Sequence, residues 1–267
     1  TDVEVRPLEK SVPLRAKIDI KDVDFTSLMR DLGVHPNSYV GWDLDEVHVP
    51  LFAGTIFPLR IDGEVTAKTK NFAVYDAPAH GAVKGRIIGV TEALVQTHCA
   101  VRPDALEFQQ SHVVTPHSVL SQGLVSIGFH NALTVDAPDI HVDLADISPI
   151  GNVKFAGKVE GEVHVSGRNN DPHIEGDIRA TDFVLGDMPF GNISAGHVSL
   201  NQLVVTLAGV RATKGRSNYE VPTARLDFGG PGAVTLDARA LSTDFDIRDL
   251  LAMFHMDDDP RFEPING

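Results

Sequence analysis

The chain of 267 residues has few cysteines and few aromatic residues, and each shortage excludes something. The single Cys99 excludes an internal disulfide. Aromatic residues make up 6% of the chain, with one tryptophan, which disfavours a carbohydrate-active enzyme that needs clustered rings. No apolar run is long enough to span a bilayer, and no signal peptide follows Thr1. We therefore expect a segment of a longer or processed protein, with any membrane anchor outside it.

Positive charge is also scarce. The chain has 23 Lys and Arg against 37 Asp and Glu, a formal net charge of −14, and the basic residues are scattered. Binding to nucleic acid needs clustered cations that displace counterions from phosphates, so we expect no nucleic-acid partner. The same charge disfavours docking on an anionic membrane surface.

Catalytic and metal-binding motifs are missing as well. The twelve His residues fall mainly in separate segments, with no HExxH or CxxC pattern around them, and there is no GxSxG, P-loop or GxGxxG motif. The acidic stretch 256–264 lacks the Gly and Glu of an EF-hand loop, which favours an exposed turn. We expect no catalytic residue, no metal and no cofactor, with a carboxylate pair of the glycosidase type as a minor alternative.

The sequence does contain long alternation of apolar and polar residues. In residues 153–166, VKFAGKVEGEVHVS, the apolar positions are Val153, Phe155, Val159, Val163 and Val165. A period of two predicts a strand with one apolar and one polar face. The segment has 14 residues and would reach roughly 45 Å when fully extended, whereas an ordinary strand has only about 5–6 residues.

The same pattern recurs along the chain. The apolar positions are Phe57, Leu59, Ile61 and Val65 in 57–68, Ile174 and Ile178 in 173–180, Val198, Leu200, Val205 and Leu207 in 197–207, and Val234 and Leu236 in 233–240. The phase changes at 201–202, which we interpret as a β-bulge. Short links rich in Gly, Pro, Asn and Asp join these segments. The sequence therefore predicts a mostly β protein with antiparallel strands.

Two segments have helical spacing instead. We expect short helices near 24–33 and 246–255, and a shortened version of the same element in 142–151. A unit of strands that ends in a short helix would then recur. On this basis we divide the chain into two β-rich segments, 1–151 and 152–267.

The apolar faces have few helices to cover them. We therefore expect the sheet to curl into an open, taco-like hydrophobic groove, with the apolar residues named above as its lining. The alternative is a closed core between two sheets, as in a structural or adhesive β-solenoid or sandwich.

Residues 157–207, GKVEGEVHVSGRNNDPHIEGDIRATDFVLGDMPFGNISAGHVSLNQLVVTL, resemble the C-terminal repeats of TamB proteins in the AsmA-like superfamily. The segments 22–33 and 242–255 are similar to the strand-then-helix units of the same superfamily. The resemblance is clear over about a third of the chain and looser over the rest, and the stretches 52–58 and 69–85 fit the repeat poorly.

The resemblance implies a non-enzymatic lipid conduit. Such a protein is anchored in the inner membrane of a Gram-negative bacterium, lies in the periplasm, and carries phospholipid towards the outer membrane in envelope biogenesis. It also implies an outer-membrane β-barrel of the TamA/BamA type as a partner. The family has no catalytic residues, so what it implies for this chain is the apolar face alone.

Overall fold

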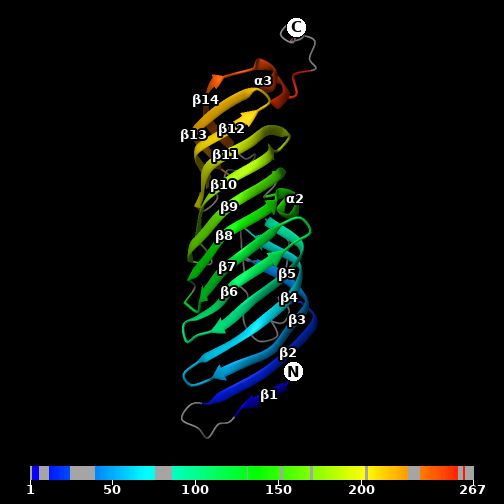
Figure 1. Ribbon diagram of the computed structural model, residues 1–267, viewed down its shortest axis with the longest axis vertical. Helices are drawn as coiled ribbons and strands as arrows, with labels where there is room; N and C mark the ends of the chain where they lie inside the picture. The colour runs from blue at the N-terminus through cyan, green and yellow to red at the C-terminus, as the bar shows by residue number, and fades with distance from the viewer. Residues whose placement is uncertain are drawn as a thin grey trace.

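Long alternating segments form long antiparallel strands in this protein (Figure 1). The structure is a computed structural model that describes residues 2–5, 12–24, 40–75, 86–130, 132–150, 153–168, 171–201, 204–227, 235–257 and 261. Fourteen strands form one sheet, in which each strand pairs with the next along the chain. The expectation of a mostly β protein with antiparallel strands is confirmed.

The first seven strands are β1 (Asp2–Val5), β2 (Pro13–Asp24), β3 (Val40–Thr55), β4 (Arg60–Tyr75), β5 (Arg86–Val101), β6 (Ala105–Val114) and β7 (Val119–Gly128). The others are β8 (Leu133–Asp143), β9 (Phe155–Arg168), β10 (Asp171–Leu185), β11 (Met188–Asn201), β12 (Val204–Lys214), β13 (Ser217–Asp227) and β14 (Thr235–Asp244). The helices in the described residues are α2 (Leu144–Ile147) and α3 (Ile247–Met253). Within the described residues β1 and β14 do not pair with each other, so the sheet is open.

Strand β9 contains most of the alternating segment 153–166 and is 14 residues long. It pairs with β8 on one side, where Asp143 lies opposite Lys158, and with β10 on the other. The boundary that we placed between 151 and 152 falls in the connection from α2 to β9. The sheet continues across this boundary because β8 and β9 are hydrogen-bonded neighbours.

Register shifts bend the sheet along its length. Non-glycine residues with positive φ occur within β2, β4, β6, β7 and β10, at Asp22, Asn71, Gln110, Gln122 and Asp182. The pairing register shifts close to Gln110, Gln122 and Asp182. A bulge bends its strand and increases the local twist. Repeated bulges therefore give the curled, elongated sheet seen in Figure 1.

One strand prediction is wrong. Residues 197–207 do not form one strand with a bulge at 201–202, because β11 ends at Asn201 and β12 begins at Val204. These two residues face each other across an antiparallel pair. The phase change marks a tight connection between two strands, since a reversal of chain direction resets the alternation.

The two helices follow β8 and β14. Helix α2 lies within the segment 142–151, and α3 lies within the range 246–255. The helix expected near 24–33 lies outside the described residues, apart from Asp24 at the end of β2.

Candidate functional site

An apolar hollow of about 350 Å³ lies on the inner face of the curled sheet, between β8 and β14. Every side chain that lines it is apolar, apart from the hydroxyl of Tyr219. This hydroxyl donates a hydrogen bond to the backbone carbonyl of Phe190, and burial raises the pKa of Tyr219 to about 12. The hollow therefore presents hydrocarbon and no free charge.

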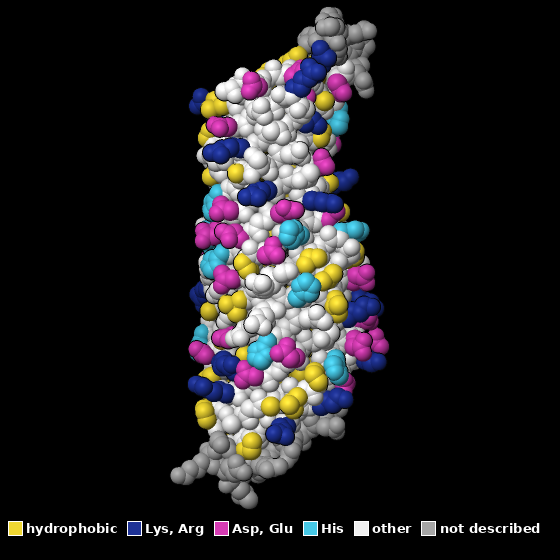
Figure 2. Space-filling model, viewed as in Figure 1, with side chains coloured by type: hydrophobic (Ala, Val, Ile, Leu, Met, Phe, Trp, Pro, Cys, Tyr) yellow, Lys and Arg dark blue, Asp and Glu magenta, His cyan; other side chains and the backbone are white. Residues whose placement is uncertain are grey.

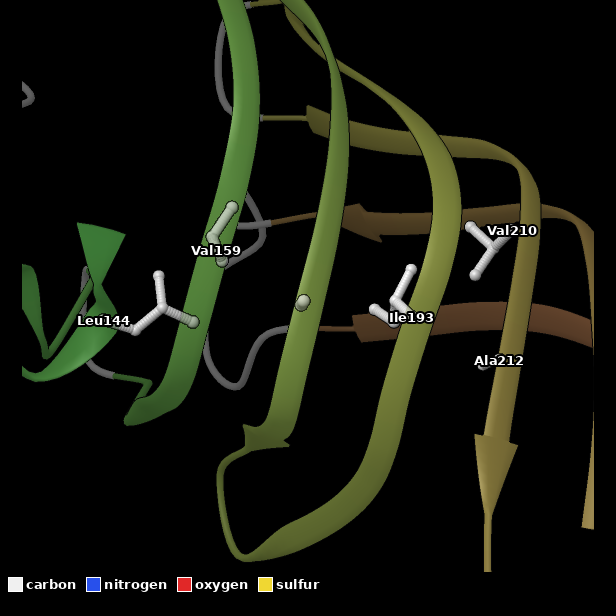
Figure 3. Packing of buried hydrophobic residues seen from close by; sticks show 6 residues of the cluster. Leu144, Val159, Ile193, Val210 and Ala212 are labelled. Carbon is white, nitrogen blue, oxygen red and sulfur yellow. The ribbon is translucent and has the colours of Figure 1, made fainter. Parts of the chain in front are cut away.

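Strands β9 to β12 curve around part of this space. In Figure 3 the side chains of Leu144, Val159, Ile193 and Val210 extend from α2, β9, β11 and β12. Together with Ala180 and Ala212 they form a buried cluster, and all of its members except Ala180 line the hollow. This packed cluster gives the hollow a fixed shape, because close-packed interiors resist deformation.

The structure brings together only part of the predicted lining. The predicted residues in the hollow are Phe155, Val159, Val163, Ile178, Val198, Val205, Leu207 and Leu236. Those outside it are Phe57, Leu59, Ile61, Val65, Val153, Val165, Ile174 and Leu200. Phe57 is in the turn between β3 and β4 and is 68% exposed. Val234 lies outside the described residues.

Several lining residues were not predicted from the sequence, because the alternation of apolar and polar residues changes phase inside a strand. In β12 the residues that line the hollow are Val205 and Leu207 before Gly209, and Val210 and Ala212 after it. Gly209 has φ +61°. In β10 the lining residues are Ile178 before Asp182, and Phe183 and Leu185 after it, and Asp182 also has a positive φ. The residues missed in this way and elsewhere are Ile140, Val142, Leu144, Ile147, Ile150, Phe183, Leu185, Phe190, Ile193, Val210, Ala212, Tyr219, Val221, Ala224, Leu226 and Ala238.

Many lining side chains keep contact with solvent. Val163, Ile178, Val198 and Leu207 are half-buried, and Leu236 is 42% exposed. Among all described residues, the one large side chain that is fully buried is Val49. The strong burial expected in the core of a sandwich is therefore limited to clusters such as the one in the lining of the hollow.

A carboxylate holds α2 at the edge of the hollow. Asp146 accepts hydrogen bonds from the Ser118 hydroxyl at 2.6 Å, from the His117 backbone N–H at 3.0 Å and from the Thr115 hydroxyl, all at the turn from β6 to β7. Burial, the largest single influence, raises the pKa of Asp146, but these hydrogen bonds together outweigh it and lower the pKa to about 2. The helix carries Leu144 and Ile147 into the lining.

The same arrangement occurs at α3. Asp249 accepts from the Ser217 hydroxyl at 2.8 Å and from the Arg216 backbone N–H at 2.8 Å, at the turn from β12 to β13. Each serine also accepts a hydrogen bond from the backbone N–H of the residue that caps its helix, Asp143 at 3.0 Å and Asp246 at 2.9 Å. Each helix is thus tied to the hairpin that precedes its own strand.

The opposite face of the sheet is polar. Figure 2 shows acidic, basic and His side chains interspersed along the whole length of one side of the molecule. Several His residues lie directly opposite a carboxylate on the neighbouring strand, as with His48 and Asp19 at 2.6 Å. Other such pairs are His98 with Glu64, His164 with Asp136, and His197 with Asp177. In the described part of the chain, no group of three possible metal ligands comes together.

None of the helices in the described ranges is long and apolar enough to cross a membrane. The candidate site is the apolar hollow, to which α2 contributes Leu144 and Ile147. No family model, curated protein or solved structure matches this chain.

Proposed function

We propose that this protein is a non-enzymatic lipid conduit, in which acyl chains lie in an apolar β-groove of the inner face while head groups stay at the open edge. The observation that carries this proposal is the hollow between β8 and β14, which is lined by hydrocarbon and still open to solvent. Exposed apolar surface of this kind is typical of binding sites.

The size of the hollow suits an acyl chain. An apolar cavity of about 150 Å³ accommodates benzene, so by proportion a hollow of about 350 Å³ has room for roughly fourteen carbon atoms. Each CH₂ removed from water contributes about 0.8 kcal/mol. One chain thus gains substantial free energy from apolar contact, while the absence of polar lining leaves the head group unrecognised.

The wider setting is part of the same proposal. We place the protein in the periplasm as a segment of an inner-membrane-anchored, AsmA-like protein, with phospholipid as its ligand and an outer-membrane β-barrel of the TamA/BamA type as its partner. Short helices such as α2 and α3 would then mark the ends of groove repeats, because both are tied to the preceding hairpin in the same way.

The competing function is a structural or adhesive domain with a closed core. The clusters of buried Ala, Val, Ile and Leu side chains favour it locally. It requires the inner face to be packed against protein in the cell.

The test places a photo-crosslinking residue at Val163, in the hollow, and at Glu162 as the matched control on the outer face. Cells that express each variant are fed radiolabelled phosphate and irradiated, and the purified protein is run on a gel. Label at 163 and not at 162 is the expected result. Absence of label at both positions in well-folded protein would contradict a phospholipid conduit and favour the closed core.

A further inference from the structure

Helix α2 and the residues that follow it form a flap at the edge of the apolar hollow. This flap, residues 144–150, contributes three side chains to the lining, those of Leu144, Ile147 and Ile150. Its far end is fixed at the start of β9, where the Phe155 backbone N–H donates to the Ser148 hydroxyl at 3.0 Å. Its near end is attached to the turn from β6 to β7 by the hydrogen bonds of Asp146, which we call the tie.

The tie includes one group that titrates near neutral pH. His117 Nδ1 lies 2.8 Å from Asp146 Oδ1. The carboxylate is 5% exposed and has a pKa of about 2, so it stays ionised across the neutral range. Its other donors are the Ser118 and Thr115 hydroxyls and the His117 backbone N–H, which do not titrate there. The net charge across the tie therefore depends on the proton of the His117 imidazole.

Charged groups on three elements face His117. Asp146 on α2 raises the pKa of His117, first through the hydrogen bond, and Asp143 at the end of β8 also raises it. Partial burial and Lys158 on β9 lower it, and the balance is a pKa above the ordinary value of 6.5. The stabilisation from the protonated imidazole is therefore fully present below about pH 6.5 and is lost as the pH rises through the raised pKa.

The equivalent tie at α3 has the same backbone contact and a different side chain at this position. Residues 115–118, TPHS, correspond to 214–217, KGRS, so Arg216 is the equivalent of His117. In both ties the backbone N–H of this residue donates to the carboxylate of the helix, at 3.0 Å from His117 and at 2.8 Å from Arg216. Arginine stays protonated throughout the range in which histidine titrates. Of these two ties, the one at α2 is therefore the one that responds to pH near neutrality.

We infer that the flap opens and closes the apolar hollow in response to protons: protonated His117 holds it against the β6–β7 turn through Asp146, and loss of the proton raises the population in which it lifts from the lining. An ion pair with one exposed partner changes such an equilibrium by about two- to fivefold. The response of the tie rests on its own geometry, whereas its bearing on acyl chains rests on the proposed lipid function.

Amide exchange in the whole protein, resolved by NMR, tests the response of the tie. The reporters are the amides of His117 and Asp143, and the matched controls are their equivalents at α3, Arg216 and Asp246. After correction for intrinsic exchange rates, protection of the reporters should fall about two- to fivefold between about pH 5.5 and pH 8, while that of the controls stays the same. Equal changes in both ties would overturn the inference.

Two substitutions at one position separate charge from shape. His117→Arg, which copies the tie at α3, should keep protection at pH 8 as high as it is in the unmodified protein at pH 5.5. His117→Gln should give the lower protection at both pH values. His48→Gln, at a distant imidazole–carboxylate pair, is the control and should leave the response unchanged. A pH response that survives in His117→Gln would contradict the role of this imidazole.

Entry of an uncharged apolar dye, N-phenyl-1-naphthylamine, tests the opening of the hollow. Its fluorescence rises in hydrocarbon surroundings, so stopped-flow mixing follows its entry. Entry should be about two- to fivefold faster at pH 8 than at pH 5.5 in the unmodified protein, and equally slow at both in His117→Arg. Equal rates in the unmodified protein would show that the flap does not control access. Failure of the dye to bind at either pH would contradict the apolar site itself, whereas the exchange measurement decides the response of the tie independently.

Discussion

The Ser118 hydroxyl donates a hydrogen bond of 2.6 Å to the Asp146 carboxylate, and so joins the turn after β6 to the helix after β8. Both side chains are largely buried, with Asp146 5% exposed and Ser118 7% exposed. Removing one partner from a buried hydrogen bond leaves the other unsatisfied, at a cost of about 1–3 kcal/mol. We therefore expect Ser118→Ala to lower the free energy of unfolding by about that amount in urea titrations.

The lowered pKa of Asp146 predicts a specific dependence on acid. A carboxylate with a folded-state pKa of about 2, below its ordinary value of 3.8, stabilises the fold above about pH 4 and loses that contribution as the pH falls towards 2. The contribution at neutral pH is about 2 kcal/mol. Asp146→Asn should remove this part of the acid transition, whereas Asp139→Asn, at an exposed carboxylate, should not. Equal acid transitions in both variants would contradict the prediction.

A charge placed in the hollow should have different effects at different depths. Val163 is half-buried and open to solvent, so Val163→Glu should leave the protein folded and abolish retention of lipid. Val159 is 9% exposed and packs in the cluster beside Leu144. A buried, unpaired charge there costs roughly 3–5 kcal/mol, so Val159→Glu should unfold the region. Circular dichroism and mass spectrometry of extracted lipid measure the two effects, and full lipid retention in folded Val163→Glu would contradict the conduit.

Two glycines with positive φ on the sheet differ in the space beside them. A Cβ at Gly161 would lie 2.1 Å from the carbonyl oxygen of Asp177 on the neighbouring strand. At Gly209, with φ +61°, a Cβ would meet nothing within 4 Å. We expect Gly209→Ala to cost about 1–2 kcal/mol from conformation alone, and Gly161→Ala to cost clearly more, because strand pairing must shift. Equal midpoints of chemical unfolding for the two variants would be inconsistent with this geometry.

The hydrogen bond from His98 to Glu64, at 2.8 Å, raises the pKa of His98 above its ordinary value of 6.5. The stabilisation that protonated His98 provides is therefore fully present below about pH 6.5 and is lost as the pH rises through the raised pKa. An NMR titration of the imidazole should show this pKa, and Glu64→Gln should lower it. Glu162→Gln, at a distant carboxylate on the same face, is the control and should leave it unchanged.

Burial raises the pKa of the Cys99 thiol to about 11. The side chain is 5% exposed, and the thiolate is the reactive form of cysteine. Native protein at pH 8 should therefore react with a thiol reagent at least a hundredfold more slowly than protein unfolded in urea. Comparable rates in the two states would show that this part of the sheet opens readily.

Strand β9 was predictable because its alternation keeps one phase from Phe155 to Val165. The lining contributed by β10 to β12 was predictable only in part, because Asp182 and Gly209 reverse the phase within their strands. A bulge depends on the pairing between two strands, and a single sequence does not encode that pairing locally.

The position of the hollow was less predictable than its chemistry. Alternation around Ile61 and Val65 is as clear as around Val163, yet the hollow is confined to the second half of the chain. The inner face of the first half contains the small buried residues Thr69 and Thr97. The curl of the sheet decides where apolar side chains enclose a space, and that curl is the sum of many small register shifts.

The strictly sequential strand order has a further consequence for the length of this molecule. Since each strand pairs only with its neighbours in the chain, the stability of the sheet is close to a sum over adjacent pairs, as in solenoid proteins. Inserting one hairpin between existing strands would lengthen the sheet by about 10 Å and leave every other pairing in place. Such a protein can therefore evolve to bridge different distances by duplication of hairpins, with no redesign of its core.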